Sequence, residues 1–211
     1  MKGGGPSGPQ WLRWIQRLQA IAQDGLTYSH DDYDLGRYEQ LRELAAEMLA
    51  AHATGTLEEA RDLLVLETGP ATPKVDVRAA VFEDDRILLV KEPEEAGWSV
   101  PGGWADVGES PSEAAARETL EESGYSVRPV RLLAAFDRDR HGHPPMAYHV
   151  YKLVYLCELL AEERLTDVEA EGARFFGEQE IPDLSVTRIT RNQISRLFEQ
   201  DRDPDRPADF D

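Results

Sequence analysis

The sequence predicts a two-part protein of mixed α and β structure, in which a helical region of about 67 residues precedes a domain of strands and helices. Two observations support this division. Apolar residues recur at the 3.6-residue spacing of amphipathic helices in residues 10–23, 35–49 and 56–67. Beyond the segment TGPATP, residues 68–73, short apolar runs separated by turn residues replace that spacing.

The helical region begins after a glycine-rich start and is expected to pack or dimerise rather than to bind nucleic acid. Trp11, Leu12, Ile15 and Leu18 mark the apolar face of its first helix, for which Gly25 is a plausible stop. Two prolines and a glycine make residues 68–73 the predicted linker, so that 1–67 forms the N-terminal region. The exposed tryptophans of the first helix would need covering, which favours a homodimer.

The second part is predicted to begin with a β-hairpin. The runs VDVRAAVF (75–82) and RILLVKE (86–92) flank the turn EDD, and WSV (98–100) follows as a short strand. Later strands are expected in residues 130–138, 148–159 and 173–177, and a final helix in 186–200. The charged, proline-rich residues 201–211 are predicted to form a disordered acidic tail.

Composition narrows the class of partner. The chain has 211 residues, of which 41 are acidic and 23 basic, so its net charge of -18 disfavours nucleic acid as a general partner. A small anionic substrate remains compatible, because a bound divalent cation can reverse the sign of one pocket.

Cysteine content and hydropathy indicate the compartment. The single cysteine, Cys157, excludes a disulfide framework and a cysteine-based zinc cluster, and its apolar neighbours predict a buried strand position. The sequence has neither a signal-peptide pattern nor an apolar run of membrane-spanning length. We therefore expect a cytoplasmic protein that does not associate with membranes.

The segment RETLEESG, residues 117–124, crowds three glutamates onto one predicted helix. Ser110, Pro111 and Glu113 form a helix-start pattern with a capping box, and Gly124 suits a left-handed helix end. At about 100° per residue, the three carboxylates project from one face; they are Glu118, Glu121 and Glu122. A solvated acidic face balanced by arginine is one interpretation of this pattern.

The loop before this helix favours a second interpretation, a cation site. The loop PGGWADVGE has three glycines, and Gly102 and Gly103 allow close approach of the backbone to a ligand. Hard divalent cations take oxygen ligands from carboxylates and backbone carbonyls, and this loop and helix provide both.

The stretch GWADVGESPSEAAARETLEESGY, residues 103–125, resembles the signature of the Nudix hydrolases. That signature is a glycine, five residues, a glutamate, seven residues, and then Arg-Glu-apolar-any-Glu-Glu-any-Gly-apolar. Every invariant position is filled. Thr119 and Tyr125 depart mildly at two variable apolar positions, although a tyrosine ring is largely apolar.

The resemblance implies the Nudix fold, a mixed β-sheet sandwiched between helices, for residues 74–200. It further implies Mg²⁺ or Mn²⁺ held by glutamates of the helix with help from a loop carbonyl, and a structural ion pair between Arg117 and Glu109. The implied metal ligands are Glu118, Glu121, Glu122 and the Gly102 carbonyl. Candidates for the general base are Glu121, Glu122 and a glutamate of a later loop, either Glu169 or Glu171, with Glu169 favoured over the alternative of a solvated loop.

The family resemblance implies hydrolysis of a nucleoside diphosphate derivative by attack of water on phosphorus. The helical N-terminal region and the segments DVRAAVF, HVYKL and PDLSVTR resemble a bacterial subgroup that acts on ADP-ribose or CDP-choline. Two alternatives stay open: removal of pyrophosphate from nucleoside triphosphates, and a regulator that binds a nucleotide without catalysis.

Four further residues are candidates for contacting this substrate. Arg78 places a guanidinium in an apolar strand, where it can bind a phosphate oxygen or pair with Asp76. Trp98 can stack on a base, as can Trp104, although packing roles suit both tryptophans. Asp137 and His141 lie in a polar loop that either closes on the substrate or stays exposed. The histidines of this loop match no standard zinc spacing.

Overall fold

The structure, a computed structural model, describes residues 9–91, 97–162 and 172–211, which form two compact units. The first unit contains residues 74–144 and 150–211, and the second contains residues 9–73 and 145–149. None of the helices in the described residues is both long and apolar enough to cross a membrane.

The second unit is built from three helices, as the apolar spacing predicts. They are α1 (Gln10–Tyr28), α2 (Asp32–His52) and α3 (Leu57–Val65). The Asp31 side chain caps α2, and Thr56 and Glu59 form a capping box at the start of α3. Small and branched apolar residues fill the core between the helices; its buried members are Ile15, Ala45, Ala46, Leu49, Ala60 and Leu64.

Gly25 does not end α1, contrary to the expectation from sequence, and the helix continues to Tyr28. The physical reason is packing between α1 and α2. A Cβ atom added at Gly25 would overlap the ring of Tyr38, so that this glycine lets the aromatic ring lie directly against the α1 backbone. Gly25 therefore allows α1 and α2 to pack closely and does not terminate a helix.

Residues 68–73, the predicted linker, are bonded to α1. The Gln23 side chain donates to the Gly69 carbonyl over 3.0 Å, and the Ala71 N–H donates to Asp24 over 2.8 Å. The loop residues 145–149 also belong to this unit, where the Met146 carbonyl accepts a hydrogen bond from Gln16. The domain boundaries drawn from the sequence remain a prediction.

The first unit contains a mixed seven-stranded sheet in the order β3-β2-β1-β5-β4-β7, with β6 paired to β2. The hairpin of β1 (Lys74–Glu83) and β2 (Arg86–Lys91) turns at Asp84 and Asp85, both with positive φ. The other strands are β3 (Trp98–Ser99), β4 (Tyr125–Asp137), β5 (Val150–Glu162), β6 (Gly172–Gly177) and β7 (Asp209–Phe210). Beside β1, β5 runs parallel, whereas the β4–β5 and β1–β2 pairs are antiparallel.

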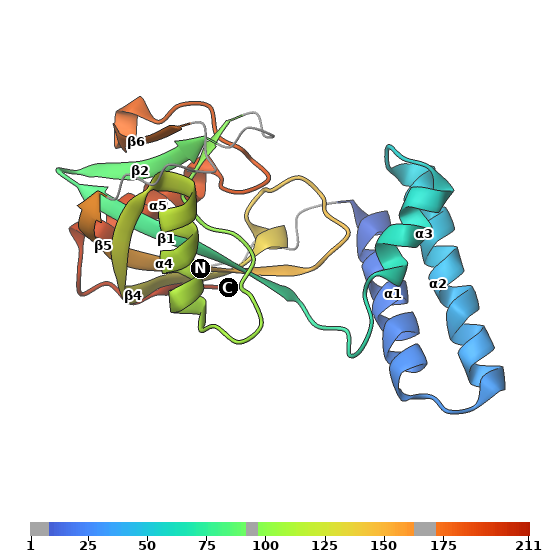
Figure 1. Cartoon of the computed structure of the whole chain (residues 1–211). Helices are drawn as coiled ribbons and strands as arrows, with labels where there is room; N and C mark the ends of the chain where they lie inside the picture. The colour runs from blue at the N-terminus through green and yellow to red at the C-terminus, as the bar shows by residue number, and fades with distance from the viewer. Residues whose placement is uncertain (1–8, 92–96, 163–171) are drawn as a thin grey trace. The chain divides into compact units, whose positions relative to one another are not determined.

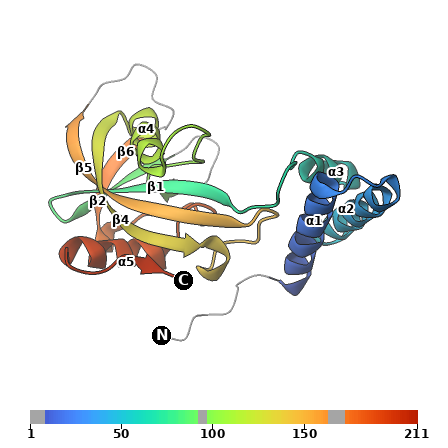
Figure 2. The same ribbon diagram turned by 90° about the horizontal axis from the view of Figure 1, so that it is seen from below.

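Two helices cover the sheet, α4 (Pro111–Ser123) on one face and α5 (Arg191–Arg202) on the other (Figures 1 and 2). Strand alternation assigns the faces, because successive residues of β1 point to opposite sides. Val77 packs with Ala114 and Ala115 of α4, whereas Ala80 packs with Ile194 of α5. The expectation of a mixed sheet between helices after a helical region is confirmed.

Cys157 lies on β5 and is buried, as its apolar neighbours predict. Burial raises the pKa of its thiol to about 12, because the thiolate is poorly solvated there. The cysteine is therefore a packing residue.

The C-terminal segment is ordered, in contrast to the expectation of a disordered tail. Helix α5 extends to Arg202, and β7 pairs in parallel with β4. The Arg131 guanidinium on β4 donates to the carbonyls of Gln200, Pro204 and Arg206. These bonds satisfy backbone carbonyl groups of a segment whose side chains supply little apolar surface. Because Arg131 is distant in sequence, the composition of the segment alone does not predict this order.

We predict that Gly25→Ala destabilises the helical unit by about 1 to 3 kcal/mol, because the added methyl group must displace the Tyr38 ring. Urea unfolding followed by circular dichroism measures the change. In the matched variant Gly25→Ala with Tyr38→Leu, the loss should be smaller than the sum of the two single losses. Strict additivity of the two losses would contradict direct contact between these residues.

Candidate active site

The glycine loop runs along the edge of β1 as an additional strand. Residues 75–79 of β1 pair with β5 on one side, while β2 pairs with β1 only near the hairpin turn. The free edge bonds to the loop instead: the Val77 N–H donates to the Gly103 carbonyl over 2.8 Å, and the Ala79 N–H to the Pro101 carbonyl over 2.9 Å. Loop and sheet are therefore held in fixed register.

Gly102 makes this approach possible. Its φ is 138°, and a Cβ atom there would overlap the Val77 carbonyl of β1, so a side chain is excluded on both conformational and steric grounds. Its own N–H donates over 2.8 Å to the Glu122 carboxylate of α4. The residue thus links the sheet edge to the acidic helix.

Helix α4 begins and ends as the sequence predicts. Ser110 and Glu113 form the reciprocal capping box, Pro111 is the first helical residue, and Gly124 adopts the left-handed conformation with φ of 76°. Thr119, one of the two departures from the signature, is fully buried and its hydroxyl donates to the Ala115 carbonyl. The helix is therefore fixed along its length.

Arg117 connects the acidic groups of the loop and the helix. Its Nε and Nη2 donate to the two oxygens of Glu109 over 3.1 and 2.7 Å, and its Nη1 lies 3.0 Å from Glu118 and 2.9 Å from Glu121. These contacts, with Glu109 foremost, raise the pKa of the guanidinium, and Arg117 in turn lowers the pKa of Glu109. One cation thus offsets the repulsion among three carboxylates.

Among the glutamates of α4, Glu122 and Glu118 are the most buried. Glu122 is 4% exposed, and its second oxygen lies 3.9 Å from the Arg188 guanidinium. The carboxylate of Glu118 lies against Gly103, where an added Cβ would come within 2.8 Å of it. Burial raises the pKa of Glu118 above its ordinary value, and the opposing effect of Arg117 does not cancel this. Both groups would be stabilised by additional positive charge.

The donor set fits a hard divalent cation. Every group at the junction of loop and helix that can serve as a ligand is an oxygen, from the glutamates or the glycine backbone. Within residues 9–91, 97–162 and 172–211, no three His, Cys, Asp or Glu side chains converge as a cage. Sharing one ion would require rotation about the side-chain torsions of Glu118 or Glu121, which are turned onto Arg117.

A buried charged cluster lies on the α5 side of the sheet, at the end of β1 and β5. Asp76 accepts two hydrogen bonds from Arg78, at 2.9 and 2.7 Å, and one from Lys152 at 2.8 Å. Burial alone would raise the pKa of Asp76, but the two cations outweigh it and hold the pKa at about 2. Burial lowers the pKa of Lys152 to about 8, because the ammonium group is poorly solvated there, and the nearby charge of Arg78 lowers it further.

The loop of residues 183–188 closes over this end of the sheet. Its backbone pairs with β3, where Trp98 N–H donates to Asp183 and Ser185 N–H donates to Trp98, both over 2.9 Å. Gly97 permits this pairing, since a Cβ there would lie 2.5 Å from the loop backbone. The pairing fixes the position from which Arg188 reaches Glu122.

Two residues that follow β4 attach to the same loop. Arg138 is 2% exposed and donates to the Pro144 carbonyl over 2.8 Å, with the Thr187 carbonyl at 3.5 Å. The Nδ1 atom of His143 bonds to the Val186 carbonyl over 2.8 Å, and burial lowers the pKa of this imidazole to about 4. Arg138 therefore adds a third buried cation to the cluster, whereas the imidazole of His143 is neutral at pH 7.

Comparison with known proteins identifies the family to which this arrangement of glycine loop and acidic helix belongs. A sequence profile described as the NUDIX domain matches residues 72–197, more than half of the chain. The chain belongs to the Nudix family. Residues 9–64 match a second profile, described as a UDP-X-like, N-terminal oligomerisation domain.

Two of the similar proteins align with nearly the whole chain, and a third aligns with about two thirds of it. YjhB of Bacillus subtilis (strain 168), named provisionally as an ADP-ribose pyrophosphatase, is 46% identical over 202 residues, covering 96% of this chain and 97% of its own. The crystal structure of a UDP-X diphosphatase is similar with 37% identity and a TM-score of 0.62, covering 95% of this chain and 98% of its own. An ADP-ribose pyrophosphatase of Streptococcus suis 89-1591, 36% identical with a TM-score of 0.61, covers 66% of this chain and 100% of its own. The chain is a Nudix hydrolase.

The predicted substrate residues of this Nudix hydrolase do not form one group. Arg78 pairs with Asp76, the alternative that the sequence left open, and also donates to the Val100 carbonyl. Trp98 packs edge-on against Phe176 at a centroid distance of 5.0 Å. Their assignment to substrate binding remains a prediction.

Asp137 and His141 are joined to the C-terminal residue. The Asp137 backbone N–H donates to Asp211 over 2.7 Å, and the His141 ring nitrogen lies 3.0 Å from the same carboxylate. Their predicted contact with substrate stays a prediction. Glu169, the favoured general base, and Glu171 lie outside the described residues.

Sequence reasoning did not single out Lys152 or Arg188. Lys152 carries the same signal as Arg78, a cation at an alternating position of an apolar strand. Arg138 and His143 are part of the polar loop that the sequence indicates, but nothing in their spacing separates them from Asp137 and His141. Their positions depend on the loop of residues 183–188, which is distant in sequence.

We predict that Arg117→Lys lowers the free energy of unfolding by about 1 to 2 kcal/mol, because an ammonium group cannot reproduce the two-pronged contact with Glu109. Denaturant titration provides the measurement. The matched control is Arg128→Lys, since Arg128 pairs with Glu158 at an exposed site, where a change within about 0.5 kcal/mol is expected. Equal losses in the two variants would argue against a bridging role for Arg117.

The buried lysine predicts an unusual dependence of stability on pH. The pKa of Lys152 falls from 10.5 in the unfolded chain to about 8 in the fold, so between these values the unfolded chain binds the extra proton. Stability contributed by Lys152 therefore rises from pH 8 to 10.5, by at most about 3.5 kcal/mol at about 1.4 kcal/mol per pKa unit. Denaturant titrations across this range test the slope.

Lys152→Met should remove that rise, whereas Lys74→Met should retain it because Lys152 is still present. A wild-type slope that persists in Lys152→Met would show that other groups produce it.

Proposed function

We propose that this chain hydrolyses the diphosphate bond of a nucleoside diphosphate derivative with the help of Mg²⁺ or Mn²⁺. The observation that carries the proposal is the junction of α4 with the glycine loop, where the buried Glu122 accepts the Gly102 N–H and Glu118 lies against Gly103. Glu118, Glu121, Glu122 and the Gly102 carbonyl are the residues that would hold the cation. When bound, it would neutralise diphosphate charge and lower the pKa of attacking water.

Other groups of the chain would position the glutamates and contact the phosphate oxygens. The Gly102 N–H orients the Glu122 carboxylate, and Arg117 positions the loop against the helix through Glu109. Arg188, a quarter exposed in its side chain and beside Glu122, can offer a guanidinium to a phosphate oxygen. The buried cations Arg78, Lys152 and Arg138 add positive charge around the end of β1 and β5 in an otherwise acidic molecule.

In the reaction, the oxygen of water forms a bond to one phosphorus and the bridging P–O bond breaks. The bridging oxygen leaves with the second phosphate, and the proton of water passes to a general base. Candidates for the base are Glu121, Glu122 and Glu169. The products are a nucleoside monophosphate and a phosphorylated second compound, and stabilisation of charge in the transition state is the largest contribution.

For the substrate, we infer an ADP-ribose type or a related nucleoside diphosphate linked to a second group. Two kinds of relative support this: proteins named for ADP-ribose, and a diphosphatase named for UDP-X that covers nearly the whole chain. CDP-choline remains in the proposal as a compound with the same linkage. The match of residues 9–64 to an oligomerisation domain supports a homodimer built through the helical unit.

We predict that Glu122→Gln lowers turnover at least about 100-fold, because the amide removes a charged oxygen from the set that would hold the cation. The assay incubates ADP-ribose, CDP-choline, a UDP-sugar and nucleoside triphosphates with Mg²⁺ or Mn²⁺ and identifies the products. Glu113→Gln is the matched control on the same helix, since Glu113 contributes only to the cap.

Release of pyrophosphate from triphosphates alone would replace the proposal with nucleotide sanitation. Nucleotide binding without turnover of any compound would indicate a regulator. Turnover that is unaffected by Glu122→Gln would place the chemistry elsewhere.

A further inference from the structure

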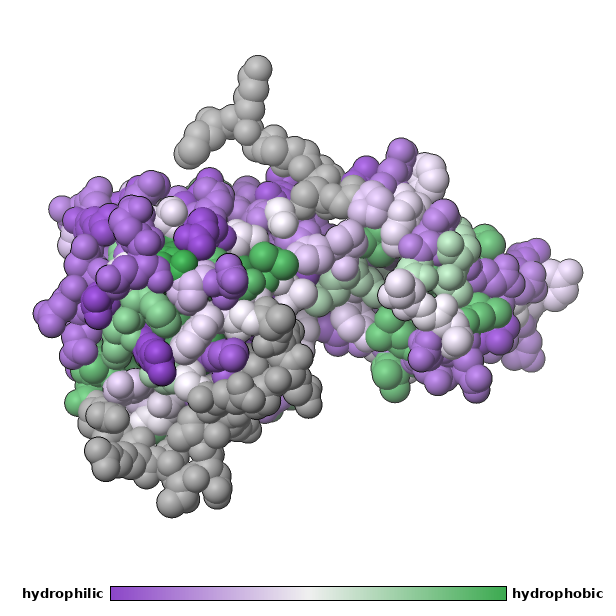
Figure 3. Space-filling view, turned by 90° about the horizontal axis from the view of Figure 1, so that it is seen from above, coloured by the Kyte–Doolittle hydropathy of each residue, from purple (hydrophilic) through white to green (hydrophobic). Residues whose placement is uncertain are grey.

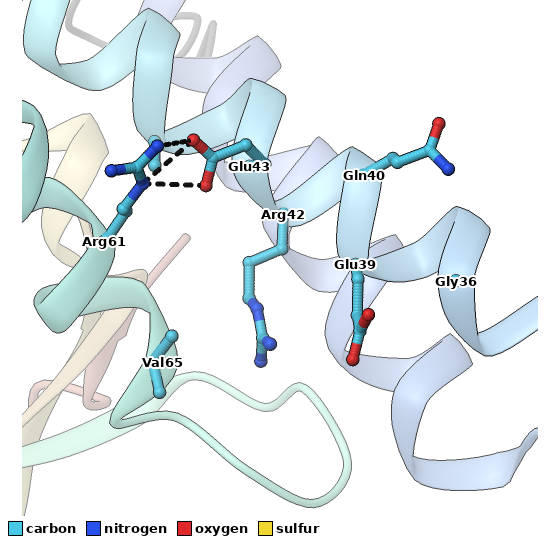
Figure 4. A pocket seen from close by; sticks show the side chains of 8 residues that line it. Gly36, Glu39, Gln40, Arg42, Glu43, Arg61 and Val65 are labelled. Atoms are coloured by element: carbon cyan, nitrogen blue, oxygen red, sulfur yellow. Dashed lines mark hydrogen bonds and ion pairs between the residues drawn. The ribbon is translucent and has the colours of Figure 1, made fainter.

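Hydrophilic side chains cover much of the surface of the described residues (Figure 3). Ion pairs at a surface are screened by water and add little to stability. The pair of Arg61 with Glu43, in the groove between α2 and α3, is an example, since both side chains are more than one-third exposed (Figure 4). The network of Asp76, Arg78 and Lys152 differs, because all three side chains are at most 8% exposed. Burying these charges costs solvation energy, so the network points to a positional role rather than to a gain in stability.

The Arg78 guanidinium connects this buried network to the glycine loop. Its Nε and Nη2 donate to the two oxygens of Asp76, and its Nη1 donates to the Val100 carbonyl over 3.2 Å. Val100 is the second residue before Gly102. The Ser99 hydroxyl donates to the same carbonyl over 2.9 Å. Two donors therefore fix the direction of the peptide group that leads into the loop.

Asp76 and Lys152 hold the guanidinium from two strands. The two residues lie opposite each other in the parallel pairing of β1 with β5. The Lys152 ammonium donates over 2.8 Å to the Asp76 oxygen that also accepts the Arg78 Nε. Because both oxygens of this carboxylate bond to the guanidinium, they fix the orientation of its plane. In that orientation Nη1 faces the Val100 carbonyl.

The glycine loop is thus held from both faces of the sheet. On the α4 side, the Gly102 N–H donates to Glu122 over 2.8 Å, and on the α5 side Arg78 holds the Val100 carbonyl. Gly102 supplies both the N–H that orients Glu122 and the carbonyl proposed for the cation. A rotation of the preceding peptide groups would therefore disturb both.

We propose that Arg78 is a positioning residue, which fixes the glycine loop so that Gly102 and Glu122 can hold the cation, and that Asp76 and Lys152 keep its guanidinium in place. The inference rests on the proposed function and deepens it. In this role Arg78 does not touch the substrate, because its side chain is 3% exposed and its guanidinium bonds to Asp76 and to the backbone of the loop. Contact of Arg78 with a substrate phosphate is the alternative.

The charge of Arg78 and its positioning contact act in opposite directions on a bound cation. Burial raises the pKa of Glu118, and the positive charge of Arg78 is among the effects that oppose this rise. That charge would repel a cation held by Glu118. If charge alone mattered, loss of Arg78 would tighten cation binding, whereas loss of the positioning contact weakens it. Variants that keep the net charge of the network therefore isolate the positioning effect.

Arg78→Lys keeps the charge but removes the bridge, because one ammonium group cannot reproduce the fork that spans Asp76 and Val100. The full chain is titrated with Mn²⁺ in the absence of substrate, and the free ion is followed by electron paramagnetic resonance. The affinity should be about 10- to 100-fold weaker than that of the wild type. Arg131→Met is the matched control, since Arg131 also holds backbone carbonyls, but those of the C-terminal segment. It should bind Mn²⁺ like the wild type.

A double variant tests the rest of the network. Asp76→Asn together with Lys152→Met removes one negative and one positive charge, so the net charge of the network is unchanged. The guanidinium of Arg78 then loses one of the two oxygens that orient it, and the Mn²⁺ affinity should fall in the same range as for Arg78→Lys. Circular dichroism and urea unfolding verify that each variant is folded. If Arg78→Lys does not fold, the double variant decides the question.

Steady-state kinetics and Glu122→Gln separate the outcomes. Weaker Mn²⁺ binding in both network variants, with a lowered kcat and wild-type binding in Arg131→Met, would support the positioning role. Wild-type Mn²⁺ affinity with a raised KM for ADP-ribose would overturn it and assign Arg78 to substrate contact. Wild-type affinity in the network variants together with loss of binding in Glu122→Gln would overturn the positioning role and leave the proposed function standing. A wild type that binds no Mn²⁺, or binds it no more tightly than Glu122→Gln does, would overturn both.

Discussion

The close approach of Gly102 to β1 is the constraint on which the active site depends. The loop of residues 101–105 substitutes for a strand where β2 has separated from β1, and only glycine fits at the tightest point. From this fixed register the chain enters the capped start of α4. The distance from sheet edge to helix then decides where Glu118 and Glu122 lie. A site held by sheet hydrogen bonds and a helix cap is more rigid than one carried by a free loop.

Acidic and basic groups of the catalytic domain are separated, with glutamates on α4 and buried cations at the end of β1 and β5. Glutamates crowded on α4 raise the local negative potential, and Arg117 relieves it on the side that faces the loop. Around the end of β1 and β5, buried cations outnumber carboxylates, and burial lowers the pKa of Lys152, an effect to which the charge of Arg78 adds. The result is an acidic helix face beside a buried basic cluster, within a molecule whose net charge is strongly negative.

Local rules were sufficient for the helix of the site and its ion pair, within residues 109–124. The capping box, the left-handed Gly124 and the pairing of Arg117 with Glu109 all join residues close in sequence. What the sequence could not predict depends on contacts between distant segments. Lys152 meets Asp76 across parallel strands, and the loop of residues 183–188 pairs with β3.

The same distinction accounts for the two departures from the sequence expectations. Gly25 has the composition of a helix stop, but the Tyr38 ring from the next helix gives it an interior role. Residues 201–211 have the composition of a disordered tail, but the Arg131 guanidinium on β4 holds their backbone. In both cases, tertiary contacts override local propensity.

The relatives are named for cleavage of a diphosphate but for different substrates. The glutamates of α4 are fixed by the helix, by its loop and by β1, whose Val77 and Ala79 N–H groups bond to that loop. Arg188 lies beside Glu122 on a different segment, the loop of residues 183–188, which pairs with β3 and also bonds to Arg138 and His143. The bonds between β1 and residues 101–103 do not involve that loop. The structure thus separates the segments that fix the glutamates from the segment that holds the neighbouring cations.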